Sequence, residues 1–153
     1  MNQPKHVVLS APDEAGRTFM EGLLQAGIPV LGLAHTLEQM VYMQEQGVEQ
    51  IAMVRQHDGE GDLAPAVPVG RIYLFEKSLP ILCQYLLICR SWTAQSVFVI
   101  QSVERDKSVP VPTIYRQLGA NHVMFTSGAR HSFLLRAELE QQEREDGLAY
   151  SSL

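Results

Sequence analysis

Short apolar runs alternate with amphipathic stretches along the first third of the chain. Residues 7–9 are apolar, and after a turn the apolar positions recur at helical spacing as far as Gly27. The succession is then repeated, because the apolar run at 28–33 is followed by Thr36, which with Gln39 forms the pattern of a helix capping box. The predicted elements of this half are a strand at 7–9, a helix at 14–26, a strand at 28–33, a helix at 37–46 and a strand at 48–54.

The second half repeats this order after a long connection. Residues 56–70 are rich in Gly, Pro and acidic side chains and follow no regular period, which is typical of a surface loop. Beyond them, residues 71–75 have the composition of a strand, and Ser78 is a suitable N-cap for an apolar helix. The remaining predicted elements are a helix at 79–92, a strand at 96–100, a short helix ending at Gly119, a strand at 122–125 and a helix from about 129 to 145.

Strands without internal alternation, each separated from the next by a helix, indicate a parallel sheet that is covered on both faces. The pattern therefore predicts a doubly wound α/β domain with three αβα layers and five or six strands, depending on whether residues 71–75 form one. We expect a single domain over residues 1–153. Its predicted parts are a first half at 5–55, a connecting loop at 56–70, a second half at 71–146 and a short polar tail at 147–153.

The predicted helix at 79–92 is apolar almost all round. Such a helix is usually buried on two sides, so it lies either in the middle of the domain or in a subunit interface. Cys83 and Cys89 lie on it six residues apart, which turns them about 240° away from each other on a helix. They cannot pair there, and we interpret them as packing thiols in a reducing compartment.

Charge and composition narrow the classes of partner. The chain has 153 residues, of which 46% are hydrophobic, and its 12 Lys and Arg against 17 Asp and Glu give a net charge of −5. This balance leaves no basic surface for nucleic-acid phosphates. The mean hydropathy is −0.04, no uncharged apolar run is long enough to span a bilayer, and the first residues lack the apolar core of a signal peptide. We therefore expect a cytoplasmic protein.

Two segments carry a resemblance to a known family. The succession at 6–54, which begins HVVLSAPDEAG, and the turn LGANHVMFT at 118–126 resemble the TrkA-N, or RCK, domains that regulate potassium transport, and more distantly the NmrA-like proteins. The resemblance covers roughly residues 5 to 140. It implies a Rossmann-like, NAD(P)-binding-like domain of regulatory function, with NAD(P) or an adenine nucleotide as the ligand.

The first predicted turn holds only part of a dinucleotide-binding fingerprint. A Gly-rich turn lets backbone amides approach a pyrophosphate at a helix N-terminus. Here the pattern reads A-x-D-x-x-G, with Ala11 and Asp13 where the first two glycines stand and Gly16 as the third. Asp13 adds bulk and negative charge at the phosphate position, or it serves as the N-cap of the helix. Ser10, Ala11, Asp13 and Gly16 are therefore candidate nucleotide-binding residues.

Two further candidates follow the second and third predicted strands. The resemblance implies an acidic residue for the ribose hydroxyls after the second strand, but residues 33–36 offer none and His35 stands there instead. Arg55 is a cation at the carboxyl end of the third predicted strand, the edge at which such folds bind anions. Both residues join the candidate nucleotide site, while each is also compatible with an ordinary surface position.

A second resemblance is to the phosphoacceptor receiver domains, which alternate five strands with five helices. In that alignment the acidic pair falls on Ala11 and Pro12 and the phosphoacceptor position on Arg55. A receiver-like chain would therefore be a pseudo-receiver, unable to hold Mg²⁺ or to accept a phosphoryl group by the usual route.

Catalytic motifs are not found in the sequence. It contains no nucleophile elbow, P-loop or C-x-x-C motif, and its histidines have no metal-ligand spacing. Enzymatic activity stays open, with a non-catalytic role favoured. We expect a regulatory Rossmann-like domain that binds a nucleotide or small anionic ligand at the carboxyl edge of its sheet. The alternative is a protein-interaction module, a pseudo-receiver or degenerate Rossmann domain, that acts through a homodimer or a partner on the helix at 79–92.

Overall fold

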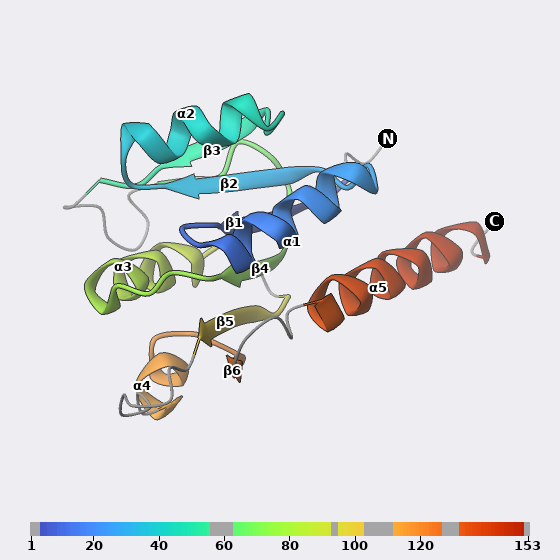
Figure 1. Ribbon diagram of the computed structural model, residues 1–153. Coiled ribbons are helices and arrows are strands. Elements are labelled where there is room, and N and C mark those ends of the chain that lie inside the picture. The colour runs from blue at the N-terminus through green and yellow to red at the C-terminus, as the bar shows by residue number, and fades with distance from the viewer. Residues whose placement is uncertain (1–3, 56–62, 93–94, 103–111, 127–131, 152–153) are drawn as a thin grey trace.

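The computed structural model describes residues 4–55, 63–92, 95–102, 112–126 and 132–151 (Figure 1). These residues form six strands and five helices, and each strand except β3 is followed by a helix. The strands are β1 His6–Ser10, β2 Val30–Ala34, β3 Gln50–Met53, β4 Val69–Leu74, β5 Val97–Ser102 and β6 His122–Thr126. The helices are α1 Glu14–Gln25, α2 Leu37–Glu45, α3 Leu79–Cys89, α4 Pro112–Gln117 and α5 Ser132–Ser151.

All six strands are parallel and follow the order β3-β2-β1-β4-β5-β6. In β1, Val8 pairs with Leu31 of β2 on one side and with Ile72 of β4 on the other. The chain therefore winds outward from β1 in one direction and, after β3, crosses back to continue from β4 in the other. This order is that of the doubly wound dinucleotide-binding fold, whereas receiver domains have the order 2-1-3-4-5. The prediction of a receiver arrangement is therefore wrong for this chain. Residues 71–74 form part of β4, so the predicted strand at 71–75 is confirmed except for its last residue.

The two faces of the sheet are buried under different helices. On one face Val8, Ile72 and Val99 pack against α3 and α4, and on the other Val7 and Leu9 pack against α1, α2 and α5. Because alternate residues of β1 enter the two separate cores, a central strand has to be apolar throughout. The three-layer arrangement expected from the sequence is confirmed.

The helix boundaries follow the predicted signals closely. Asp13 and Thr36 are the N-caps of α1 and α2, and each side chain accepts a hydrogen bond from the backbone amide three residues on. Gly27 and Gly47 follow the C-caps with φ of 77° and 98°, a left-handed conformation that favours glycine. The largest difference lies in α5, which runs to Ser151, so that a helical backbone occupies most of the stretch predicted as a polar tail.

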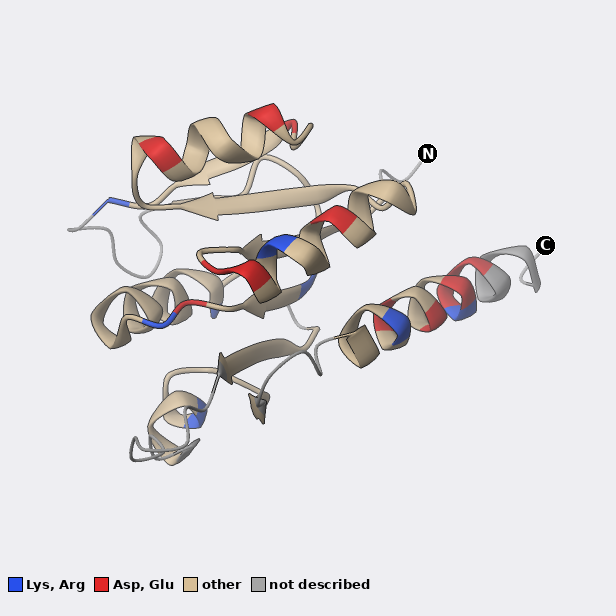
Figure 2. Cartoon of the chain, viewed as in Figure 1, with Lys and Arg blue, Asp and Glu red and all other residues tan. Residues whose placement is uncertain are grey.

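A buried ion-pair network ties α5 to the middle of the sheet. Arg71 of β4 donates from Nε to Oε1 of Glu138 at 2.6 Å and from Nη1 to Oε1 of Glu145 at 2.6 Å. The Tyr73 hydroxyl donates to Glu138 at 2.7 Å, and Gln142 donates to the other carboxylate oxygen at 3.0 Å. The Glu138 side chain is fully buried and that of Arg71 is 11% exposed. Figure 2 shows further acidic residues along α5, where Glu140 and Glu143 are exposed.

The apolar helix α3 has one buried face and one half-covered face. Leu82, Leu86 and Cys89 are buried in the core, which confirms that Cys89 is a packing thiol. Burial raises the pKa of the Cys89 thiol to about 12. Leu79, by contrast, is 47% exposed, and Cys83 is half-buried. Within the described residues, no helix combines the length and apolar character needed to cross a membrane.

Candidate functional site

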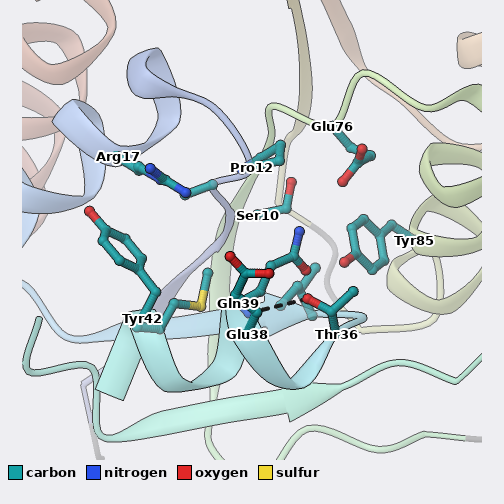
Figure 3. Close-up of a pocket in the computed structure, with 12 residues that line it drawn as sticks. Ser10, Pro12, Arg17, Thr36, Glu38, Gln39, Tyr42, Glu76 and Tyr85 are labelled. Carbon is teal, nitrogen blue, oxygen red and sulfur yellow. Dashed lines mark hydrogen bonds between the residues drawn. The ribbon is translucent and has the colours of Figure 1, made fainter. Parts of the chain in front are cut away.

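A pocket of about 490 Å³ opens at the carboxyl edge of the sheet, where the chain's direction of winding reverses between β1 and β4. In open α/β sheets this reversal leaves a crevice beyond the strand ends, because the two following helices lie on opposite faces. Figure 3 shows Arg17 and Tyr42 on one side of the pocket and Glu76 and Tyr85 on the other, with Ser10 and Pro12 between them.

The turn between β1 and α1 forms the floor of this region and is closely packed. The Gly16 amide donates to the Asp13 carboxylate at 2.9 Å, so a side chain of the protein occupies part of the helix N-terminus. A Cβ on Gly16 would lie 2.9 Å from the Ala11 Cα and 3.1 Å from the Phe75 ring. Gly16 therefore permits close contact between the helix and the strands, which is the role of the third glycine in the dinucleotide fingerprint.

Ser10 connects the two central strands at the crossover. Its hydroxyl oxygen accepts a hydrogen bond from the Phe75 amide at 3.1 Å, just beyond the end of β4. Ser10 is 1% exposed yet lines the pocket. The Phe75 amide uses a lone pair of this oxygen and not its proton, so the hydroxyl can donate a hydrogen bond to a ligand.

The turn between β2 and α2 contains the predicted capping box. The Gln39 amide donates to the Thr36 hydroxyl at 3.1 Å, and the Gln39 side-chain oxygen accepts from the His35 amide at 3.0 Å. These bonds satisfy the Gln39 amide in the first turn of α2 and the amide of His35, the residue before the N-cap, and they fix the path of the chain beside the pocket. Thr36 and Gln39 both line it.

A cation that the sequence interpretation missed lies on the α1–α2 side of the pocket. The Arg17 guanidinium carbon is 4.4 Å from the centroid of the Tyr42 ring, a distance typical of a cation–π contact. This contact orients the exposed arginine beside the pocket. Arg17 directly follows Gly16 in the first turns of α1, so its position after the degenerate fingerprint was a signal available in the sequence.

The opposite side of the pocket contains a buried carboxylate that the sequence interpretation also missed. Glu76 is 5% exposed, and its Oε1 accepts the amides of Lys77 and Ser78 at 3.1 Å each. Its Oε2 lies 4.0 Å from Nδ1 of His35, which in turn is 3.0 Å from the Tyr85 hydroxyl. Burial, followed by the charge of Glu76, raises the pKa of Tyr85 above its ordinary value. The phenol thus stays neutral near pH 7 and serves as a hydrogen-bonding group.

The predicted site residues do not all meet in one place. Ser10 and Ala11 line the pocket, and Asp13 and Gly16 form the turn beside it. His35 and Arg55 instead line a second hollow, of about 770 Å³, with the exposed side of α3. The Arg55 carbonyl accepts a hydrogen bond from the Gln84 side chain there. The described residues include no cluster of three or more His, Cys, Asp or Glu that could hold a metal ion.

Solved structures share the fold of this chain across most of its length. The NAD(P)-binding domain of an exopolyphosphatase-related protein from Archaeoglobus fulgidus superposes with a TM-score of 0.55 at 15% identity, covering 92% of this chain and 98% of that one. The TrkA-N domain of the inner membrane protein ybaL from Escherichia coli gives a TM-score of 0.53 at 14% identity, covering 91% of this chain and 98% of that one. The fold is that of the TrkA-N domains.

The GsuK channel bound to NAD contains a similar unit within a longer chain. It gives a TM-score of 0.59 at 19% identity, and the match covers 80% of this chain but only 21% of the channel's. No family model and no curated protein matches the sequence. The predicted resemblance to TrkA-N and NAD(P)-binding Rossmann domains is therefore confirmed at the level of the fold.

Proposed function

We propose that this chain is a non-catalytic regulatory domain that binds a nucleotide in the pocket at the carboxyl edge of its sheet. The observation that carries the proposal is the pocket itself, which lies at the strand crossover where open α/β sheets bind ligands. The TrkA-N fold supports a nucleotide as the ligand, because neighbours with this fold are described as NAD(P)-binding or bound to NAD.

Arg17 is the residue on which anion binding would depend. Its guanidinium lies at the side of the pocket and is oriented by Tyr42, so little side-chain entropy is lost when a phosphate binds. Ser10 and Thr36 add hydroxyl groups that can contact a sugar or a phosphate. Arg55, which the sequence favoured as the anion ligand, lines the other hollow and is a weaker candidate.

Thermal unfolding of the purified protein with AMP, ADP, ATP, NAD and NADPH tests the proposal. A ligand at about 100 times its Kd adds about 2.7 kcal/mol to the free energy of unfolding, which raises Tm by about 5–10 °C for a domain of this size. Arg17→Ala should remove most of the shift. Arg136→Ala changes an exposed arginine on α5 and is the matched control, so it should leave the shift intact.

The shifts in Tm of the two arginine variants show which hollow holds the anion. A shift that survives Arg17→Ala but not Arg55→Ala would move the anion site to the second hollow. If none of the five nucleotides changes Tm or gives heat in calorimetry, nucleotide binding is refuted.

A second candidate function is self-association through the exposed side of α3. The hollow beside it is lined by apolar groups of Met53, Pro80, Ile81 and Leu87, and such a surface favours an interface. Leu87→Lys adds a charge to this surface, whereas Leu86 is 1% exposed and its substitution would disrupt the core. Sedimentation equilibrium should show a dimer that becomes a folded monomer in Leu87→Lys. A monomeric wild-type protein would exclude this function.

A further inference from the structure

The two ends of the pocket carry opposite charges. Arg17 stands at one end over Tyr42, and the carboxylate of Glu76 stands at the other beside Tyr85, as Figure 3 shows. Arg17 lies on α1 and Glu76 in the segment between β4 and α3, and the two side chains stand on opposite sides of the pocket. A ligand that spans the pocket therefore meets a cation at one end and a buried anion at the other, and the exposed side chain of Glu38 also lines the pocket.

Glu76 has acceptor capacity that the protein leaves for a ligand. Its Oε1 is used by the amides of Lys77 and Ser78, while Oε2 is 4.0 Å from His35, which is longer than a hydrogen bond. The side chain is only 7% exposed, and it lines the pocket. A carboxylate this deeply buried is stabilised by each donor that reaches it, so a ligand hydroxyl or amine facing it would contribute strongly to affinity.

The turn beside the pocket, at the start of α1, disfavours a diphosphate. At the start of α1 the Asp13 carboxylate already accepts the Gly16 amide, and Glu14 adds a second negative charge in the first turn. Lys77 lies 3.9 Å from Asp13 and is 60% exposed, so it offsets this charge only in part. A diphosphate at this helix N-terminus would face a carboxylate in place of free amides.

We infer that the pocket selects a dipolar ligand, a nucleoside monophosphate whose phosphate binds Arg17 and whose hydroxyl or amino group binds Glu76, over a dinucleotide with a central diphosphate. This inference rests on the proposed function and specifies its ligand. The donor that faces Glu76 is a ribose hydroxyl or the base amino group, which share the chemistry that the carboxylate requires.

Titration calorimetry with AMP and NAD tests the selectivity. We expect AMP to bind at least about tenfold more tightly than NAD to the wild-type protein, because only NAD places two phosphates near Asp13. Asp13→Asn keeps a residue that caps a helix well but removes the charge, so it should raise the affinity for NAD by about tenfold and leave that for AMP nearly unchanged.

A comparison of ligands and variants tests the role of Glu76. Glu76→Gln keeps one oxygen for the amides of Lys77 and Ser78, and it should lower the affinity for AMP by about tenfold or more. A ligand that lacks the donor should bind the wild-type protein about as weakly as AMP binds the Gln variant. If a ribose hydroxyl faces Glu76, that ligand is 2′,3′-dideoxy-AMP, and if the base amino group faces it, that ligand is inosine monophosphate. The Gln variant should no longer distinguish that analogue from AMP, a coupling that a merely structural Glu76 would not produce.

The outcomes distinguish the selectivity for a monophosphate from nucleotide binding itself. If NAD binds as tightly as AMP, or if Glu76→Gln and the donor-deleted ligands lose affinity independently, the selectivity is refuted while nucleotide binding stands. If neither AMP nor NAD binds, the selectivity is refuted, and the proposed function is refuted with it when ADP, ATP and NADPH also fail to bind.

Discussion

The ion-pair network between β4 and α5 gives the sharpest stability prediction. Replacing Arg71 with Met keeps most of the side-chain stem but leaves Glu138, whose side chain is fully buried, with only Tyr73 and Gln142 as partners. Breaking a buried pair by removing one partner costs about 3–5 kcal/mol. Because domains unfold with about 5–15 kcal/mol, Arg71→Met should lose a large fraction of the stability without losing the fold.

Urea unfolding followed by circular dichroism measures this loss. The slope of the transition should stay unchanged, since the surface exposed on unfolding is nearly the same. Arg71→Met combined with Glu138→Met should be more stable than Arg71→Met alone, because apolar groups then replace the unpaired charge. Arg136→Met, at an exposed position, should stay within about 0.5 kcal/mol of the wild type. A cost below about 1 kcal/mol for Arg71→Met would show that the ion pair contributes no more than an exposed salt bridge.

The same network predicts a dependence on pH. The hydrogen bond from Arg71 is the main cause that lowers the pKa of Glu145 below its ordinary value of 4.5. A carboxyl group with a lowered pKa stabilises the folded state fully above its ordinary pKa, and this contribution is lost as the pH falls through the lowered value. Wild-type stability should therefore decrease more steeply below about pH 4.5 than that of Arg71→Met. Parallel slopes in the two proteins would contradict this assignment.

Three further predictions concern the caps, the close packing and the thiols. Thr36→Ala should lower the free energy of unfolding by about 1 kcal/mol in urea unfolding, and Thr36→Ser should restore most of it, since either hydroxyl can accept the Gln39 amide. Gly16→Ala should cost about 1–3 kcal/mol in the same assay, because its Cβ would lie 2.9 Å from backbone. In a thiol-reagent titration Cys83 should react in the native protein, and Cys89 only after unfolding.

Much of the fold could be predicted because it depends on local patterns. The apolar strands, the capping box at Thr36 and the glycine turns are each contained within a few residues, and the structure confirms them. The strand β4 could be predicted from composition only as one of two possibilities, since a short apolar segment such as residues 71–75 is compatible with a strand or with a connection. Its neighbours β1 and β5 decide it.

The site was predicted less completely because it depends on distant contacts. Ser10 and Ala11 were identified from a fingerprint that names positions in one turn, and they line the pocket. Glu76 follows the fourth strand, and nothing nearby in the sequence distinguishes it from a surface acid. Its burial depends on the crossover and on Gln101 of β5, whose side chain donates to the Glu76 carbonyl at 2.7 Å. His35 follows β2 and contacts Glu76 and Tyr85 at the edge of the pocket, whereas Arg55 follows β3 and lines the second hollow beside α3.

The link between Arg71 and α5 also bears on the order in which the chain can fold during synthesis. Glu138 and Glu145 follow Arg71 by 67 and 74 residues. After Arg71 has been translated, the ribosome must therefore add nearly half of the chain again before both partners exist. Until then the two carboxylates that pair with Arg71 of β4 have not been synthesised. The first three strands and their helices can assemble early, whereas completion of the sheet waits for the last helix to emerge.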